Sequence, residues 1–389
     1  MARHQTRRKF LKTGLLAAVA LPAATSGLMG LSIPKTLATP AASKPLNILI
    51  LGGTSYLGPH QIAYALKRGH KVSTFTRGKT VPKIHTELFD EVEQLIGDRE
   101  DNLQALEGRS WDVVIDNSGR KVQWTHDTAQ LLKDRVNLYM YTSSTGVYYP
   151  YLNESISENT PLILETPSDL NEAEKYEQDY GVMKANSELE VIRAFGKERT
   201  VVIRPTYMLG PGDRTDRFLH WPIKFNEGGT TLVPGKSEDL VQYIDVRDIA
   251  EWFIRLAESN TSGIFNGVGP EADQTILEFI KEGGQSFNQK LDPILIDDYD
   301  FLREQNLLYA IPWVMADKTH FGSARISNNR ALSGGIGYRS LSTTVRDTYS
   351  WWYSDAVSED RRSAFEANPN ALHQRESSIL EAWSEHQRK

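Results

Sequence analysis

The chain has 389 residues, a formal net charge of −6 and no cysteine. The missing cysteines exclude disulfides and thiolate metal sites, and they suit an oxidising compartment. An acidic chain is a poor partner for nucleic acid, so the charge favours a small-molecule enzyme. The nine histidines show no ligand spacing, and the sequence therefore predicts no metal site.

The N-terminal segment, residues 1–42, is basic and mildly apolar. It opens with a twin-arginine motif, Thr6–Lys12, followed by a stretch rich in Ala and Gly over 13–33. We expect residues 1–42 to be a signal peptide, cleaved after Ala38 or Ala42, and an exported, periplasmic or extracellular protein. The segment holds six Lys/Arg and no acid, so its removal would leave a formal charge of −12. An uncleaved anchor or an N-terminal arm is the alternative interpretation.

A short apolar run then ends in a glycine-rich turn. Residues 47–51 predict a strand, and residues 60–68 predict a helix from their apolar spacing. Between them lie Gly52, Gly53, Thr54, Ser55, Tyr56, Leu57 and Gly58, with Ser55 where the middle glycine of the usual pattern would stand. Such a turn lets the backbone approach a pyrophosphate, and the helix N-terminus offers free N–H groups to it. We predict that these seven residues bind a dinucleotide, and a turn without a ligand is the alternative.

The end of the next predicted strand bears on the choice of cofactor. Residues 71–76 predict this strand, and it runs into Arg77 and Lys79 with no acidic residue. An acid at this place contacts the ribose 2′-OH of NAD, whereas an arginine accommodates the 2′-phosphate of NADP. The sequence therefore favours NADP over NAD, with Arg77 as the contact, and a solvated strand end is the alternative.

Two later segments supply groups for proton transfer. Ser144 follows a predicted strand over 138–142, at the sheet edge where open α/β sheets bind ligands. Tyr180 and Lys184 are four residues apart in a predicted helix over 172–195, so they share a face. A phenol is a poor base at neutral pH, but a nearby ammonium favours the phenolate, and a serine hydroxyl can hold the substrate oxygen.

These segments, in this order, resemble the extended short-chain dehydrogenase/reductase superfamily of the NAD-dependent epimerase/dehydratase type. The resemblance runs from about residue 46 to residue 353. It implies an α/β fold with a doubly wound parallel sheet (Rossmann) over 43–210. A smaller C-terminal α/β substrate lobe would occupy 211–389, partly returning to the main sheet and ending in an arm.

The resemblance also implies roles for single residues. Ser144 would orient the substrate, Tyr180 would be the catalytic acid/base, and Lys184 would bind the ribose and activate the tyrosine. In addition, Asp98 would lie near the adenine, and Asn117 and Ser118 would line the dinucleotide cleft.

Two departures concern the substrate. Nucleotide-sugar enzymes of this superfamily tend to carry an asparagine where this chain has Tyr207 and an arginine where it has Val241. Both residues usually contact the substrate diphosphate, so a nucleotide sugar is less favoured than family membership alone would suggest.

An exported enzyme has little cofactor pool to draw on, so we expect a reaction that leaves its bound nicotinamide unchanged. The main hypothesis is an epimerase or dehydratase acting on a sugar or sugar-like hydroxyl or carbonyl compound. A net NADP-dependent carbonyl reductase and a non-catalytic dinucleotide-binding protein are the alternatives. The expected partners are a small-molecule substrate and the export machinery, without nucleic acid, and the chain is compatible with a homodimer.

Overall fold

The computed structural model describes residues 41–42, 44–151, 155–317 and 320–388. The expected signal peptide therefore lies almost wholly outside the described residues. Among the described helices, none is both long and apolar enough to cross a lipid bilayer.

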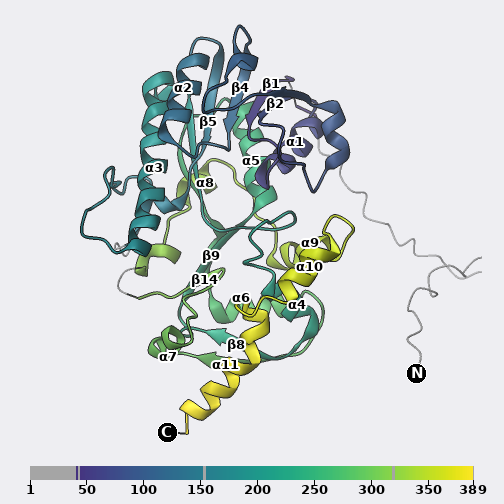
Figure 1. The fold of residues 1–389 in the computed structure, drawn as a ribbon, viewed down its shortest axis with the longest axis vertical. Coiled ribbons are helices and arrows are strands. Elements are labelled where there is room, and N and C mark those ends of the chain that lie inside the picture. Colours follow the sequence, from purple (N-terminus) through teal and green to yellow (C-terminus); the bar gives the residue numbers. More distant parts are fainter. Residues whose placement is uncertain (1–40, 43, 152–154, 318–319, 389) are drawn as a thin grey trace, which may run out of the picture. The chain divides into compact units, whose positions relative to one another are not determined.

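A seven-stranded parallel sheet forms the centre of the larger lobe, with its strands in the order β10-β6-β5-β4-β1-β2-β3 (Figure 1). Its strands are β1 (Asn47–Leu51), β2 (Lys71–Thr76), β3 (Glu93–Ile96), β4 (Trp111–Asp116), β5 (Val136–Thr142), β6 (Thr200–Pro205) and β10 (Gly263–Gly267). The chain order reverses between β1 and β4, which is the switch point of doubly wound folds. The predicted fold class is confirmed.

Helices cover both faces of this sheet. Ile48 and Ile50 of β1 pack in one apolar layer with α1 (Leu57–Lys67) and α5 (Val246–Glu258). Leu49 and Leu51 pack in a second layer with α2 (Val122–Leu132) and α3 (Glu172–Phe195). Successive strand residues point to opposite faces, so a strand covered on both sides is apolar throughout.

The predicted elements around the glycine turn and the Tyr-Lys pair are present. Helix α1 begins three residues earlier than the apolar spacing predicts, because Pro59 is tolerated in a first turn, where its missing N–H has no helical partner. Helix α3 has the predicted bounds and begins at a capping box. The Asn171 side chain accepts from the Glu174 backbone N–H, and the Glu174 carboxylate accepts from the Asn171 backbone N–H.

The rest of the chain builds a smaller lobe from short sheets and helices. Its strands are β7 (Met208–Leu209), β8 (Gly229–Pro234), β9 (Leu240–Asp245), β11 (Gly269–Thr275), β12 (Leu291–Ile296), β13 (Tyr309–Ala310) and β14 (Trp313–Val314). Its helices are α4 (His220–Glu227), α6 (Ile276–Gly284), α7 (Tyr299–Glu304), α9 (Leu341–Trp352), α10 (Glu359–Glu366) and α11 (Leu372–His386). Helix α8 (Asn329–Ser333) instead packs against β10 and the main sheet. Strand β10 returns from this region to the main sheet beside β6.

Candidate active site

The glycine turn after β1 is shaped for the close approach of a ligand. Gly52 adopts φ +82°, a left-handed conformation that favours glycine. A Cβ on Gly58 would stand 2.3 Å from the carbonyl oxygen of Gly53, so only glycine lets α1 start this close to the strand. No side chain caps the start of α1, and its first turn carries no acid. The Gly58 N–H donates to the Ser55 carbonyl oxygen and Pro59 has no N–H, so the remaining N–H groups of the first turn are those available for an anion.

A cavity of about 480 Å³ opens in front of this turn. Residues from the turn and from the ends of the neighbouring strands line it. Of the predicted cofactor residues, those lining the cavity are Gly52, Thr54, Ser55, Tyr56, Leu57, Arg77, Asp98, Asn117 and Ser118. Gly53, Gly58 and Lys184 are not among its lining residues. The shape of the turn, its free N–H groups and the position of the cavity at the carboxyl ends of the strands fit a dinucleotide.

Lys184 lies beneath this cavity and is held in place by the backbone. It is 7% exposed and donates to the carbonyl oxygen of Thr142, 3.0 Å away, and Thr142 itself lines the cavity. Burial lowers the pKa of Lys184 to about 8, while Asp116 and Glu188 oppose the shift. The side chain is therefore an ammonium at neutral pH.

Tyr180 and Ser144 meet as the sequence predicts. Ser144 caps the short 3-10 helix Thr145–Tyr148 by accepting from the Gly146 N–H, and its hydroxyl lies close enough to Tyr180 to act on the pKa of the phenol. The tyrosine is 42% exposed, but its hydroxyl end is packed by protein, and this burial raises its pKa. The neighbouring Ser144 hydroxyl and the charge of Arg120 act in the opposite direction and lower this pKa. The phenol is thus protonated in this structure and can donate a proton.

A second close approach brings the Tyr180 helix onto the Ser144 segment. A Cβ on Gly181 would stand 2.4 Å from the carbonyl oxygen of Gly146. Beneath this contact, Glu188 of α3 accepts from Ser143 and pairs with Arg204 of β6 at 2.6 Å. The ion pair is buried, with both side chains 3% exposed. It fixes α3 against the strand ends that carry the site.

Sequence reasoning missed three arginines and the Gly181 contact. Arg99, Arg120 and Arg214 also line the cofactor cavity. Arg99 is buried and pairs with Asp116, whereas Arg214 approaches the Ser55 hydroxyl at 3.5 Å. Arg120 could have been found, because it follows Asn117 and Ser118 in the same loop after β4. Arg214 comes from a distant loop after β7, for which the sequence offers no local signal.

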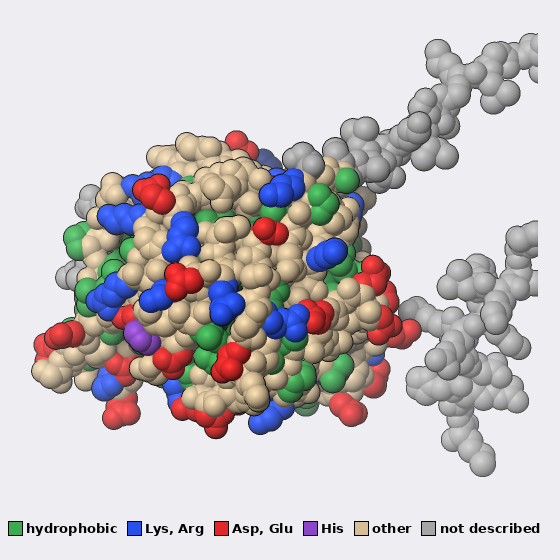
Figure 2. All heavy atoms as spheres, turned by 90° about the horizontal axis from the view of Figure 1, so that it is seen from above, with side chains coloured by type: hydrophobic (Ala, Val, Ile, Leu, Met, Phe, Trp, Pro, Cys, Tyr) green, Lys and Arg blue, Asp and Glu red, His purple; other side chains and the backbone are tan. Residues whose placement is uncertain are grey.

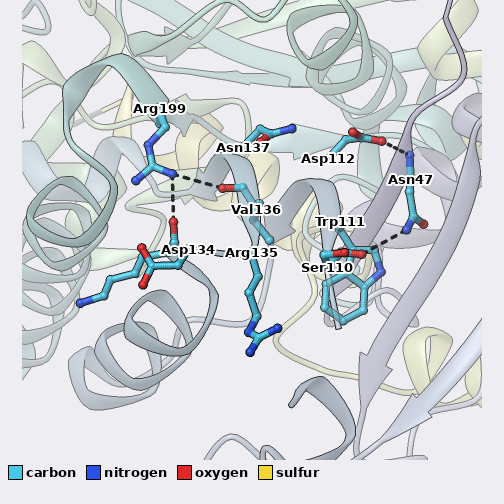
Figure 3. Close-up of a pocket in the computed structure, with 10 residues that line it drawn as sticks. Asn47, Ser110, Trp111, Asp112, Asp134, Arg135, Val136, Asn137 and Arg199 are labelled. Atoms are coloured by element: carbon cyan, nitrogen blue, oxygen red, sulfur yellow. Dashed lines mark hydrogen bonds between the residues drawn. The ribbon is translucent and has the colours of Figure 1, made fainter. Parts of the chain in front are cut away.

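A second hollow, of about 570 Å³, lies at the opposite edge of the sheet, where β1, β4 and β5 begin (Figure 3). Its hydrogen bonds tie its own walls together: Arg199 donates to the carbonyl oxygens of Lys133 and Val136, and Asp112 accepts from the Asn47 N–H. It lies at the strand starts, whereas open α/β sheets bind their ligands at the strand carboxyl ends. Within the described part of the chain, no cluster of His, Asp and Glu side chains is arranged to hold a metal ion.

The fold and the site together define an enzyme built on a nicotinamide dinucleotide, with a Ser/Tyr/Lys group beside the cofactor cavity. Residues 48–267 match the model of the NAD dependent epimerase/dehydratase family, and the chain belongs to that family. The matched segment contains the glycine turn, Ser144, Tyr180 and Lys184.

Solved structures of similar fold include the enzyme WbmH of Bordetella bronchiseptica in complex with NAD⁺, with a TM-score of 0.58 at 15% identity over 81% of this chain and 100% of that one. The UDP-glucose 4-epimerase of Bifidobacterium longum, with NAD⁺ and UDP, gives 0.56 at 16% identity over 79% and 98%. A human epimerase family protein with NADPH gives 0.53 at 19% identity over 78% and 99%.

Among curated proteins, the chain is 29% identical over 252 residues to the chloroplast stem-loop binding protein of 41 kDa b from Arabidopsis thaliana. This match covers 60% of the chain and 61% of the relative, so the chain spans about three fifths of that protein's length.

Proposed function

We propose that this chain is an exported epimerase or dehydratase that acts on a hydroxyl or carbonyl group of a sugar or sugar-like substrate and prefers NADP. The observation that carries the proposal is the proximity of Ser144 to Tyr180, one helical turn before the buried Lys184 ammonium, which donates to Thr142 in the lining of the cavity in front of the glycine turn. A binding module without chemistry would have no need of this group.

Each residue has a distinct part in the proposed reaction. The bound nicotinamide would accept and return a hydride. Tyr180 exchanges a proton with the substrate oxygen, and Ser144 holds that oxygen by a hydrogen bond. Lys184, one helical turn after Tyr180, would lower the cost of forming the phenolate through its positive charge. The turn N–H groups and Gly52 cradle the pyrophosphate.

The preference for NADP is supported by Arg77 and Lys79, which are exposed and line the cofactor cavity. Both can approach a 2′-phosphate without breaking an ion pair, since neither has a carboxylate partner within the described residues. The expected export supports a redox-neutral reaction, because an enzyme outside the cytoplasm has little means of renewing its cofactor.

The substrate site differs from that of nucleotide-sugar enzymes at two positions, which favours a substrate other than a nucleotide sugar. Tyr207 and Val241 stand where the diphosphate contacts of those enzymes are expected, and Val241 is fully buried.

The proposal is tested by incubating the purified protein with NADP⁺ and a panel of sugars, sugar acids, sugar phosphates and nucleotide sugars. A product detected by mass spectrometry without net formation of NADPH supports an epimerase or dehydratase. Formation of NADPH in equal amount to product would instead identify a net dehydrogenase. The Lys184→Met variant serves as the control for cofactor-independent conversion.

Nucleic-acid binding is a second candidate function, because the Arabidopsis relative is named a stem-loop binding protein. The charge speaks against it, since the chain carries 44 basic and 50 acidic side chains. On the face seen in Figure 2, acidic and basic side chains are interspersed. Titration of a labelled RNA stem-loop at two salt concentrations tests this function, because contacts with phosphate groups give a steep salt dependence. Absence of binding at the lower salt concentration would reject it.

A further inference from the structure

A cavity of about 430 Å³ lies in the smaller lobe. Its walls come from the loop before α4 and α4 itself, from the segment 306–311 after α7, and from α10 and the start of α11. Figure 1 shows α10 lying close to α4. These segments are distant in the sequence, so the cavity exists only in the folded lobe.

The charged side chains lining this cavity are mostly positive. Arg217, Arg361 and Arg375 contribute three guanidinium groups, against the single carboxylate of Asp216. That carboxylate already pairs with Arg361. Arg217 is exposed, and neither it nor Arg375 has a carboxylate partner in the part of the chain that the structure describes. The positive charges of Arg217 and Arg375 therefore favour the binding of an anion.

The decisive feature is His220, which is 4% exposed and lines the same cavity. Neither of its ring nitrogens has a hydrogen-bond partner among the described residues, and Nδ1 of the neighbouring His373 also lacks one. Burial lowers the pKa of His220 to about 3, so its ring is neutral. A neutral imidazole offers one donor and one acceptor. Leaving both unused inside a protein is costly, and buried polar groups without partners are rare.

We propose that this cavity binds a hydroxylated organic anion, with its phosphate or carboxylate group at Arg217 and Arg375 and a hydroxyl at His220. A hydroxyl both donates and accepts, as the neutral imidazole requires. The apolar wall formed by Trp221, Phe365 and Leu372 covers the body of the ligand. The cavity has the volume that small-molecule sites need.

The proposal is tested by isothermal titration calorimetry of the full-length protein. The probes are glucuronate and glucose 6-phosphate, with glucose and inorganic phosphate as ligands that carry only one of the two recognised features. We expect one saturable site for the hydroxylated anions and at least tenfold weaker binding of glucose and of phosphate. Glucuronate binding without glucose 6-phosphate binding would identify a carboxylate site, and the reverse result a phosphate site.

Three variants show where the probe binds. His220→Leu removes both unpartnered nitrogens at similar volume, so we expect affinity to fall at least tenfold while the melting temperature of the free protein is unchanged or raised. Arg217→Ala, at an exposed side chain, should also weaken binding tenfold without altering the fold. Arg135→Ala, in the hollow at the strand starts, should leave the affinity for the probes unchanged.

The proposal does not depend on the catalytic assignment, because Tyr180→Phe should bind the probes as the wild type does. Absence of saturable binding would overturn it, as would equal losses in the Arg135→Ala and Arg217→Ala proteins, which would indicate general attraction of anions. Should His220→Leu fail to fold, the Arg217→Ala result decides alone.

Discussion

The catalytic site and the His220 cavity differ in how their polar groups are held. At the catalytic site, Lys184 donates to a backbone carbonyl, and Ser144, beside Tyr180, accepts from a backbone N–H. In the cavity, His220 is equally buried, yet its two nitrogens have no partners among the described residues. Groups that must keep one geometry during a reaction are fixed before the substrate arrives. Groups left without partners indicate where a ligand supplies the missing bonds.

The largest expected effect concerns the first of these regions. Tyr180→Phe keeps the ring and its packing against Gly146 but removes the ionisable oxygen. Turnover of the substrate found by the panel should fall by roughly 10²–10⁴-fold, because a positioned acid/base contributes that much. Dinucleotide affinity, followed by NADPH fluorescence, should remain near the wild-type value. Wild-type turnover in this variant would show that the proton transfer lies elsewhere.

The next effect concerns the close approach at the glycine turn. Gly58→Ala places a methyl group within 2.3 Å of the Gly53 carbonyl oxygen and should push α1 away from the strand. We expect dinucleotide affinity to fall by about a hundredfold, roughly 2.7 kcal/mol, as judged by fluorescence titration. Gly337→Ala is the matched control, because a Cβ there meets nothing within 4 Å. Equal affinities in the two variants would contradict the role assigned to Gly58.

A third effect is a pH dependence of stability, to which each of the two regions contributes one buried histidine. Burial lowers the pKa of His60, beside the glycine turn, to about 4 and that of His220 to about 3. The unfolded chain takes up these protons below its ordinary pKa near 6.5, whereas the folded chain does not. The unfolding free energy should therefore fall as the pH drops from 6.5 to 4.5, by roughly 2 kcal/mol for each histidine.

Urea denaturation at pH 7.5, 5.5 and 4.5 measures this dependence. The His220→Leu protein should lose less stability on acidification than the wild type, since one of the two buried histidines is gone. If both proteins lost the same stability over that range, the neutral, unpartnered state of His220 would be refuted.

The smallest effect concerns cofactor choice. Arg77→Ala should weaken NADPH binding about tenfold, roughly 1.4 kcal/mol, and leave NADH binding unchanged, because the lost charge faces only the 2′-phosphate. Titration of both cofactors into wild type and variant measures this, with Arg135→Ala as the control. Tighter binding of NADH than of NADPH by the wild type would reject the role given to Arg77.

Local sequence was enough to determine the sheet and the catalytic helix. The runs 47–51 and 71–76 form strands with the predicted bounds, and 172–195 forms the predicted helix, because apolar spacing and capping residues act over a few positions. The order of glycine turn, Ser144 and Tyr180 with Lys184 also predicted which groups meet, since parallel strands bring their carboxyl ends to one edge.

Only the tertiary structure decided which residues from distant parts of the chain meet at the sites. Arg214 reaches the cofactor cavity from a loop more than 150 residues after Ser55, and Gly181 meets Gly146 across two elements. The His220 cavity needs walls from α4, α10 and α11, and whether a histidine nitrogen finds a partner depends on all of them at once. Spacing along the chain records local periodicity, whereas such contacts depend on how distant segments pack.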